Sequence, residues 1–140
     1  MENRTEKCVL VLDKQLPPGL AANAAVILGI SMGRCRPDIV GERVYDREGQ
    51  AYEGIVRFPV PVLQADAEQL KKIREQLLQP GFERVASASF TSLAQGCRSY
   101  EAFIKKMAAT PGEQLECLGI ALCGGKRAVN RLTGTLPLLR

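Results

Sequence analysis

Histidine is absent from this chain of 140 residues, and tryptophan is absent as well. The lack of histidine excludes the Ser–His and Cys–His nucleophile systems and every zinc site that uses an imidazole ligand. A nucleophilic hydroxyl in this protein would need a lysine or a carboxylate as its base. The reaction chemistry open to the chain is therefore narrow.

The CxxC spacing is missing too, although the sequence holds five cysteines, an odd number. Cys117 and Cys123 fall on one predicted strand, where a rise of about 3.3 Å per residue puts them about 20 Å apart. That separation is too large for a disulfide, and no zinc-knuckle spacing is present. We therefore expect free, buried thiols, which are typical of proteins in a reducing cytoplasm.

The sequence shows neither a secretory signal nor a membrane-spanning segment. Residues 1–6 are polar and lack the apolar core of a signal peptide. The longest apolar stretch, residues 16–32, is interrupted by Pro17, Pro18 and Asn23 and falls short of the roughly 20 apolar residues that a span needs. The acidic residues lack the spacing of a calcium-binding loop. We expect a cytoplasmic protein with no membrane contact, no metal and no cofactor.

The chain has the length and composition of one globular domain over residues 1–140, because 46% of its residues are hydrophobic. Its net charge of +4 lies within residues 105–140, which hold six lysines and arginines against two glutamates. This excess is small for phosphate-driven affinity, and no aromatic residues alternate with the basic ones. Nucleic-acid binding is therefore only weakly indicated.

The pattern of apolar residues predicts four strands that alternate with helices. The strands are predicted over residues 8–12, 55–58, 82–89 and 115–123, and the helices over 20–32, 66–78, 99–108 and 126–133, with a small hairpin around Val44 and Tyr52. Asp66 and Gln69 form a capping-box pattern, and residues 110–113 have the composition of a type II turn. The alternation indicates an α/β sandwich with helices on both faces of a four-stranded sheet.

A first candidate site lies where the first strand leads into the helix over residues 20–32. Ligands of such sheets bind beyond the carboxyl ends of strands, so Asp13, Lys14, Gly19 and Asn23 are candidate pocket residues. The helix is apolar all round and is expected to be buried on all sides. Asn23 would then need a hydrogen-bond partner, either a ligand or a neighbouring backbone group.

The end of the third predicted strand carries a second candidate cluster, Ser87, Ser89 and Thr91. These hydroxyls could hold a phosphate or act as nucleophiles with Lys14 or Asp13 as the base. They could equally be solvated turn hydroxyls.

A third cluster, Gly124-Gly125-Lys126-Arg127, joins the fourth strand to the last helix. Such a junction with two cations is a candidate anion site, although it matches neither of the common glycine-rich phosphate motifs. The alternative is a solvated polar face.

Three segments together resemble the type 2 peptidyl-tRNA hydrolase superfamily. Residues 7–13 are similar to its first strand, and Gly19-Leu20-Ala21-Ala22-Asn23 is similar to its G-K-x-A-A-Q helix start. The end of the chain, residues 118–122 and 129–139, resembles its last strand and its closing V-x-K-[VL]-T-G-x-L-x-L-L motif. The resemblance is greatest to a bacterial branch of uncharacterised proteins. It implies a three-layer α/β/α sandwich with a four-stranded mixed sheet. It also implies a homodimer and makes tRNA a candidate partner.

The residues that carry the hydrolase activity are substituted in this chain. Leu20 stands in place of the family's lysine, and Asn23 or Ala24 in place of its glutamine. The later histidine and the D-[AC]-G-x-T segment have no counterpart; residues 87–92 occupy that place, followed by an inserted helix. Loss of the lysine removes charge stabilisation from an ester- or phosphate-directed site.

Three functions follow as hypotheses. The first is a small-ligand or regulatory binding module with a pocket between Lys14, Asn23 and residues 87–91. The second is a divergent hydrolase of aminoacyl or peptidyl esters in which Lys14 replaces the missing lysine. The third is a structural dimer subunit with residues 136–139 at its interface.

Overall fold

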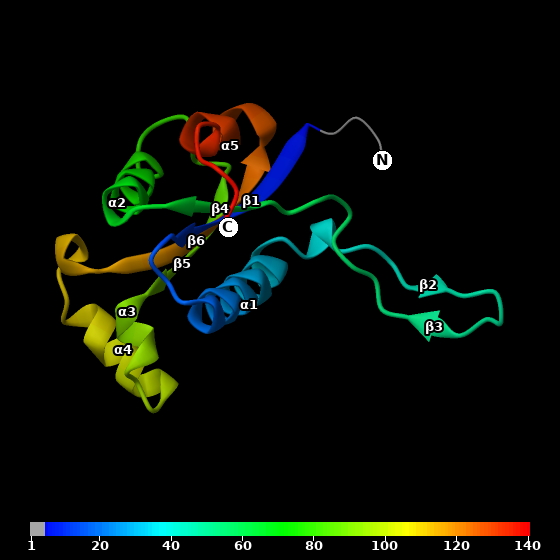
Figure 1. Ribbon diagram of the computed structural model, residues 1–140, viewed down its shortest axis with the longest axis horizontal. Coiled ribbons are helices and arrows are strands. Elements are labelled where there is room, and N and C mark those ends of the chain that lie inside the picture. The colour runs from blue at the N-terminus through cyan, green and yellow to red at the C-terminus, as the bar shows by residue number, and fades with distance from the viewer. Residues whose placement is uncertain (1–4) are drawn as a thin grey trace.

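A four-stranded mixed sheet lies at the centre of the fold in the computed structural model, which describes residues 5–140 (Figure 1). The strand order is β4-β1-β6-β5; β1 and β4 are parallel, and β6 runs antiparallel to both of its neighbours. The strands are β1 (Glu6–Asp13), β4 (Val62–Ala65), β5 (Ala86–Thr91) and β6 (Cys117–Gly125). This confirms the prediction of an α/β protein with a four-stranded mixed sheet flanked by helices.

Helices cover both faces of the sheet. Helix α1 (Pro18–Cys35) packs on one face against β1, β5 and β6, and α2 (Ala67–Gln76) and α5 (Lys126–Thr133) pack on the other (Figure 1). Strand β1 supplies both cores, since Cys8, Leu10 and Leu12 face α1 whereas Val9 and Val11 belong to the opposite core. Burial on both faces accounts for the uninterrupted apolar run of this strand.

Two shorter helices, α3 (Ser92–Gln95) and α4 (Tyr100–Ala108), follow the end of β5. The Ser99 hydroxyl accepts a hydrogen bond from the Ala102 N–H at 3.1 Å and so caps α4 as predicted. The capping box of α2 is also confirmed: the Gln69 N–H donates to the Asp66 carboxylate at 2.8 Å, and the Asp66 N–H donates to the Gln69 side chain at 2.9 Å. Side chains close in sequence determine both helix starts.

The second strand was predicted in the wrong place. Residues 55–58 form no strand, and Val56 makes only an isolated bridge with Val40. The sheet instead uses β4, beyond the two prolines, in register with residues 10–13 of β1. The type II turn at residues 110–113 is likewise wrong, because Gly112 begins a 3-10 helix (Gly112–Gln114) and does not have a positive φ. For the strand, long-range pairing of β4 with β1 overrides the local preference. For the turn, the chain continues from Pro111 directly into the 3-10 helix.

A hairpin of β2 (Val44–Tyr45) and β3 (Ala51–Tyr52) extends far from the sheet (Figure 1). It follows α1 and a 3-10 helix (Pro37–Ile39). Its turn is organised by Asp46, whose carboxylate accepts hydrogen bonds from the Gln50 N–H at 2.9 Å and the Tyr52 hydroxyl at 2.8 Å. We call residues 41–54 the arm.

Helix α1 is not buried on all sides, contrary to the prediction. Its buried residues are Ala21, Ala24, Leu28 and Met32, which form a single stripe against the sheet. The opposite side of the helix is exposed because nothing else in the described part of the chain packs over it. Packing among residues 5–140 therefore accounts for only one side of this apolar helix.

Candidate functional site

Part of the predicted pocket lies in a cleft of about 650 Å³ between α1, the end of β5 and the α3–α4 segment, here called the α1–β5 cleft. Asn23, Ser89 and Thr91 line it, as predicted, and so do residues that the sequence did not indicate: Gln95, Cys97, Arg98, Ser99, Tyr100 and Phe103. The added residues come from the inserted segment after β5. Their place in the cleft depends on how α3 and α4 fold back beside α1, which no local motif signals.

The polar groups of the α1–β5 cleft differ in their availability. Thr91 is buried, and its hydroxyl contacts the Met107 sulfur at 3.8 Å. Asn23 is exposed rather than buried, and none of residues 5–140 hydrogen-bonds its side chain, so the backbone partner considered above is not found among them. The guanidinium of Arg98 is likewise exposed and unpaired among the described residues. Asn23 and Arg98 are therefore free to bind a ligand.

An aromatic pair forms the apolar part of this cleft. The rings of Tyr100 and Phe103 meet edge to face with their centroids 5.7 Å apart, and Ile27 of α1 lies in the same lining. The cleft thus combines one cation and several amides and hydroxyls with an apolar surface. Such a combination binds a small ligand that has an anionic group and an apolar body.

Lys14 lines a different cleft, of about 610 Å³, on the other side of α1. Its neighbours there are apolar apart from Arg140, and they include Leu12, Leu16, Leu138 and Leu139. The prediction of one pocket shared by Lys14 and Asn23 is therefore wrong. Helix α1 begins at Pro18, only four residues after Lys14, and crosses the sheet so that the two side chains open on opposite sides of it.

The remaining residues of the predicted pocket line neither cleft. The Asp13 carboxylate accepts a hydrogen bond from the Gln15 N–H at 2.9 Å and so stabilises the turn after β1. Ser87 is exposed on the edge strand β5, opposite Leu122. Gly19 lies in the first turn of α1, with nothing within 4 Å of the place where a Cβ would be. Asp13 thus serves the fold, and neither Ser87 nor Gly19 lies in the α1–β5 cleft or in the cleft that holds Lys14.

The Gly124–Arg127 junction is only partly open. The Lys126 N–H at the start of α5 already donates to the Thr5 carbonyl at 2.8 Å, and Gly124 packs against Val85. Gly125 and Arg127 line a cleft of about 720 Å³ that contains Arg84 and Arg131 but also Glu6 and Glu83. Carboxylates within the cleft and an occupied helix N–H weaken it as an anion site.

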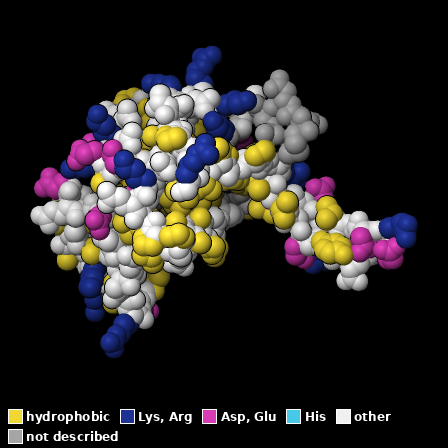
Figure 2. All heavy atoms as spheres, viewed as in Figure 1, with side chains coloured by type: hydrophobic (Ala, Val, Ile, Leu, Met, Phe, Trp, Pro, Cys, Tyr) yellow, Lys and Arg dark blue, Asp and Glu magenta, His cyan; other side chains and the backbone are white. Residues whose placement is uncertain are grey.

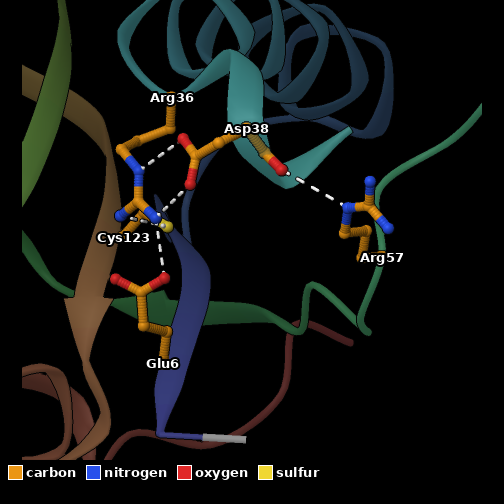
Figure 3. A network of polar contacts seen from close by, with 5 residues as sticks. All are labelled: Glu6, Arg36, Asp38, Arg57 and Cys123. Atoms are coloured by element: carbon orange, nitrogen blue, oxygen red, sulfur yellow. Dashed lines mark hydrogen bonds and ion pairs between the residues drawn. The ribbon is translucent and has the colours of Figure 1, made fainter. Parts of the chain in front are cut away.

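Sequence reasoning missed a network of charged side chains that surrounds the buried thiol of Cys123 beside β1 (Figure 3). The Arg36 guanidinium donates to Glu6 at 2.7 Å and to Asp38 at 2.8 and 2.9 Å, and its remaining nitrogen approaches the Cys123 sulfur at 3.6 Å. Arg57 joins the network through the Asp38 carbonyl at 3.4 Å. The hydrogen bonds from Arg36 lower the pKa of the Asp38 carboxyl.

Cys123 is the direct register partner of Cys8 across β1 and β6, and both thiols are buried. Since the Lys126 N–H bonds to the Thr5 carbonyl in this register, Cys8 and Cys123 form a non-hydrogen-bonded pair, for which the Cα atoms lie about 4.5 Å apart. The hydrogen bond between the thiols lowers the pKa of Cys123, an effect that Arg36 reinforces, and raises the pKa of Cys8. Only the sheet register brings the two cysteines together.

We expect two of the five thiols to react quickly with Ellman's reagent in the native protein. Cys35 is exposed and Cys97 is partly exposed, whereas Cys8, Cys117 and Cys123 are buried; burial also raises the pKa of Cys117. The other three should react only after unfolding in guanidinium, because a thiolate must form and be reached by the reagent. Fast reaction of a third thiol, located by mass spectrometry, would contradict the described burial.

The fold and the site define an α/β protein whose four-stranded mixed sheet is flanked by helices and carries a polar–apolar cleft beside α1. No helix within residues 5–140 is long and apolar enough to cross a membrane, and these residues form no group of three or more metal-ligating side chains. The chain belongs to the family described as protein of unknown function (DUF2000), whose profile matches residues 6–140.

A solved structure has the same fold: Atu0240, a protein of unknown function from Agrobacterium tumefaciens strain C58. It superimposes with a TM-score of 0.86 at 19% sequence identity, over 97% of this chain and 98% of the other. None of the curated proteins searched matches this chain.

Proposed function

We propose that this protein is a small-ligand or regulatory binding module whose ligand occupies the α1–β5 cleft. The observation that carries the proposal is the composition of the cleft: free Asn23 and Arg98 face the same space as the Tyr100–Phe103 pair. No lysine, carboxylate or histidine is among its lining residues, so its hydroxyls have no general base. The cleft is thus equipped for recognition rather than for turnover.

We further infer that the scaffold is that of the type 2 peptidyl-tRNA hydrolase superfamily. The segments that carry the resemblance lie on β1, the start of α1, β6 and α5, around a four-stranded mixed sheet. Leu20, which replaces the family's lysine, is an exposed apolar side chain of α1. This replacement favours a binding role over the hydrolysis of peptidyl esters.

Binding is tested with phenyl phosphate and N-benzoylglycine, which combine an anion with an aromatic ring, as probes in titrations followed by amide NMR shifts. We expect shifts confined to α1, the end of β5 and the α3–α4 segment. The Arg98→Gln variant should bind about tenfold more weakly or worse, because a charge-assisted hydrogen bond contributes roughly 1.5–3 kcal/mol. Arg127→Gln, an exposed arginine outside the cleft, is the matched control and should bind as the wild type does. Equal loss in both variants would contradict the assignment to this cleft.

The hydrolase alternative is tested by release of the amino acid from N-blocked aminoacyl-tRNA. We expect no turnover, because the cleft that holds Lys14 and Arg140 contains no hydroxyl or amide side chain among its lining residues. Turnover that a Lys14→Ala variant loses would replace the binding proposal with a divergent hydrolase that has a relocated cation.

A further inference from the structure

The outer face of α1 is apolar and uncovered. Leu20, Val26 and Ile30 are exposed, Ile30 by 71%, and Ile27 is exposed at the edge of the α1–β5 cleft. Figure 2 shows hydrophobic side chains on the surface around α1. Residues 18–33 include no charged side chain, whereas the exposed side of α2 carries two lysines and two glutamates, Glu68, Lys71, Lys72 and Glu75. A helix that faces water permanently has a polar outer side. The outer face of α1 is therefore suited to an interface.

The arm is a second apolar surface without a partner. Val44, Tyr45 and Tyr52 are at least half exposed, and Ile55 at its base is 80% exposed. Within residues 5–140 the arm is held at its base, where the Gly41 N–H donates to the Ile55 carbonyl at 2.8 Å and the Arg57 guanidinium lies 3.6 Å from the Glu42 carboxylate. A two-stranded hairpin is marginally stable unless it packs against something. The arm therefore also needs a surface to lie on.

The arm points away from α1 of its own chain, so the two surfaces cannot cover each other within one molecule (Figure 1). A notch opens between the arm and the body, with hydrophobic side chains along both of its sides (Figure 2). We propose that a second copy of this chain occupies this notch, so that each arm lies on the outer face of α1 of the other copy. A twofold axis makes the two contacts identical and covers both surfaces in both chains.

Charge also favours a second copy over an unrelated occupant. The arm holds the four carboxylates Glu42, Asp46, Glu48 and Glu53 against Arg43 and Arg47, a net charge of −2. Since the whole chain carries +4, the rest of the molecule carries +6. The opposite net charges of the arm and the rest of the chain favour the approach of an arm to the body of a second copy over contact between two arms. The apolar faces of the arm and of α1 supply the contact area, and the net charges favour their approach.

Sedimentation velocity over a dilution series tests this dimer. The wild type should be a dimer, and Ile30→Glu on the helix and Ile55→Glu at the base of the arm should each raise the dissociation constant about a hundredfold or more, because each change acts at two identical contacts. Leu78→Glu is the matched control: Leu78 is 85% exposed on the far side of the sheet, after α2, and its variant should remain a dimer. Circular dichroism establishes that the variants are folded.

Mixing the two variants separates the proposed contact from other dimers. A heterodimer of Ile30→Glu and Ile55→Glu retains one arm–helix contact in which both residues are wild type. We therefore expect native mass spectrometry, with one variant labelled with ¹⁵N, to show more heterodimer than either homodimer. A monomeric wild type would overturn the proposal, as would dimers that Ile55→Glu leaves intact while Ile30→Glu abolishes them, since those would be joined by α1 alone.

Discussion

Replacement of Ile120 by alanine is expected to lower the free energy of unfolding by roughly 2–5 kcal/mol. Ile120 lies on β6, an interior strand of the sheet, and its side chain is completely buried in the core beneath α2 and α5. Its register partners are Val11 on β1 and Ser89 on β5. Removal of three carbons there leaves a cavity that two hydrogen-bonded neighbours cannot close.

Urea unfolding followed by circular dichroism measures this loss, and Leu10→Ala extends the test to the core beneath α1. Lys126→Ala is the control, because the side chain is exposed at the start of α5 and only its backbone N–H is used by the fold. It should change stability by less than about 0.5 kcal/mol. Similar losses for Ile120→Ala and Lys126→Ala would contradict the strand assignment.

Gly119→Val is expected to destabilise the protein by at least roughly 1–3 kcal/mol, the usual cost of overpacking. A Cβ at this position would lie 2.9 Å from Leu12 Cδ2 and 3.0 Å from Leu28 Cδ1, and both leucines are fully buried. The absence of a side chain at Gly119 lets α1 approach the sheet where β6 passes beneath it. Valine adds two further methyl groups to a space that has no room for the first carbon.

Gly19→Ala provides the control for this substitution. Gly19 lies in α1, and nothing in the described structure is within 4 Å of its Cβ position. Alanine should therefore leave stability unchanged or raise it by up to about 1 kcal/mol, because it restricts the unfolded chain. If thermal melting showed the two variants to be equally stable, the close approach of α1 at Gly119 would be wrong.

The sequence specified those features whose causes lie within a few residues of each other. The Asp66–Gln69 capping box, the Ser99 cap and the hairpin around Val44 and Tyr52 form as predicted, because each depends on side chains next to the backbone that they organise. The continuous apolar run of β1 similarly indicated a strand covered on both faces. The alternation of predicted strands and helices was sufficient to predict the α/β class.

The candidate site depended on the packing of distant segments. Asn23 and Ser89 were predicted to share a pocket and do line one cleft, but Arg98 and Tyr100 enter it only because α3 and α4 fold back toward α1. Lys14 does not line this cleft, because α1 lies between Lys14 and Asn23. Hydrophobic periodicity shows which face of a helix is apolar, but it does not show what lies on either side of that helix.

The sequence by itself thus determined the elements, their caps and the α/β class, since these follow from local hydrogen bonding and from the spacing of apolar side chains. Only the tertiary structure decided that Cys8 faces Cys123, that Arg36 joins Glu6 to that pair, and that α1 keeps one apolar side uncovered. Register and packing bring together residues more than a hundred positions apart. An apolar helix has the same sequence pattern whether its outer side meets its own chain or a second one.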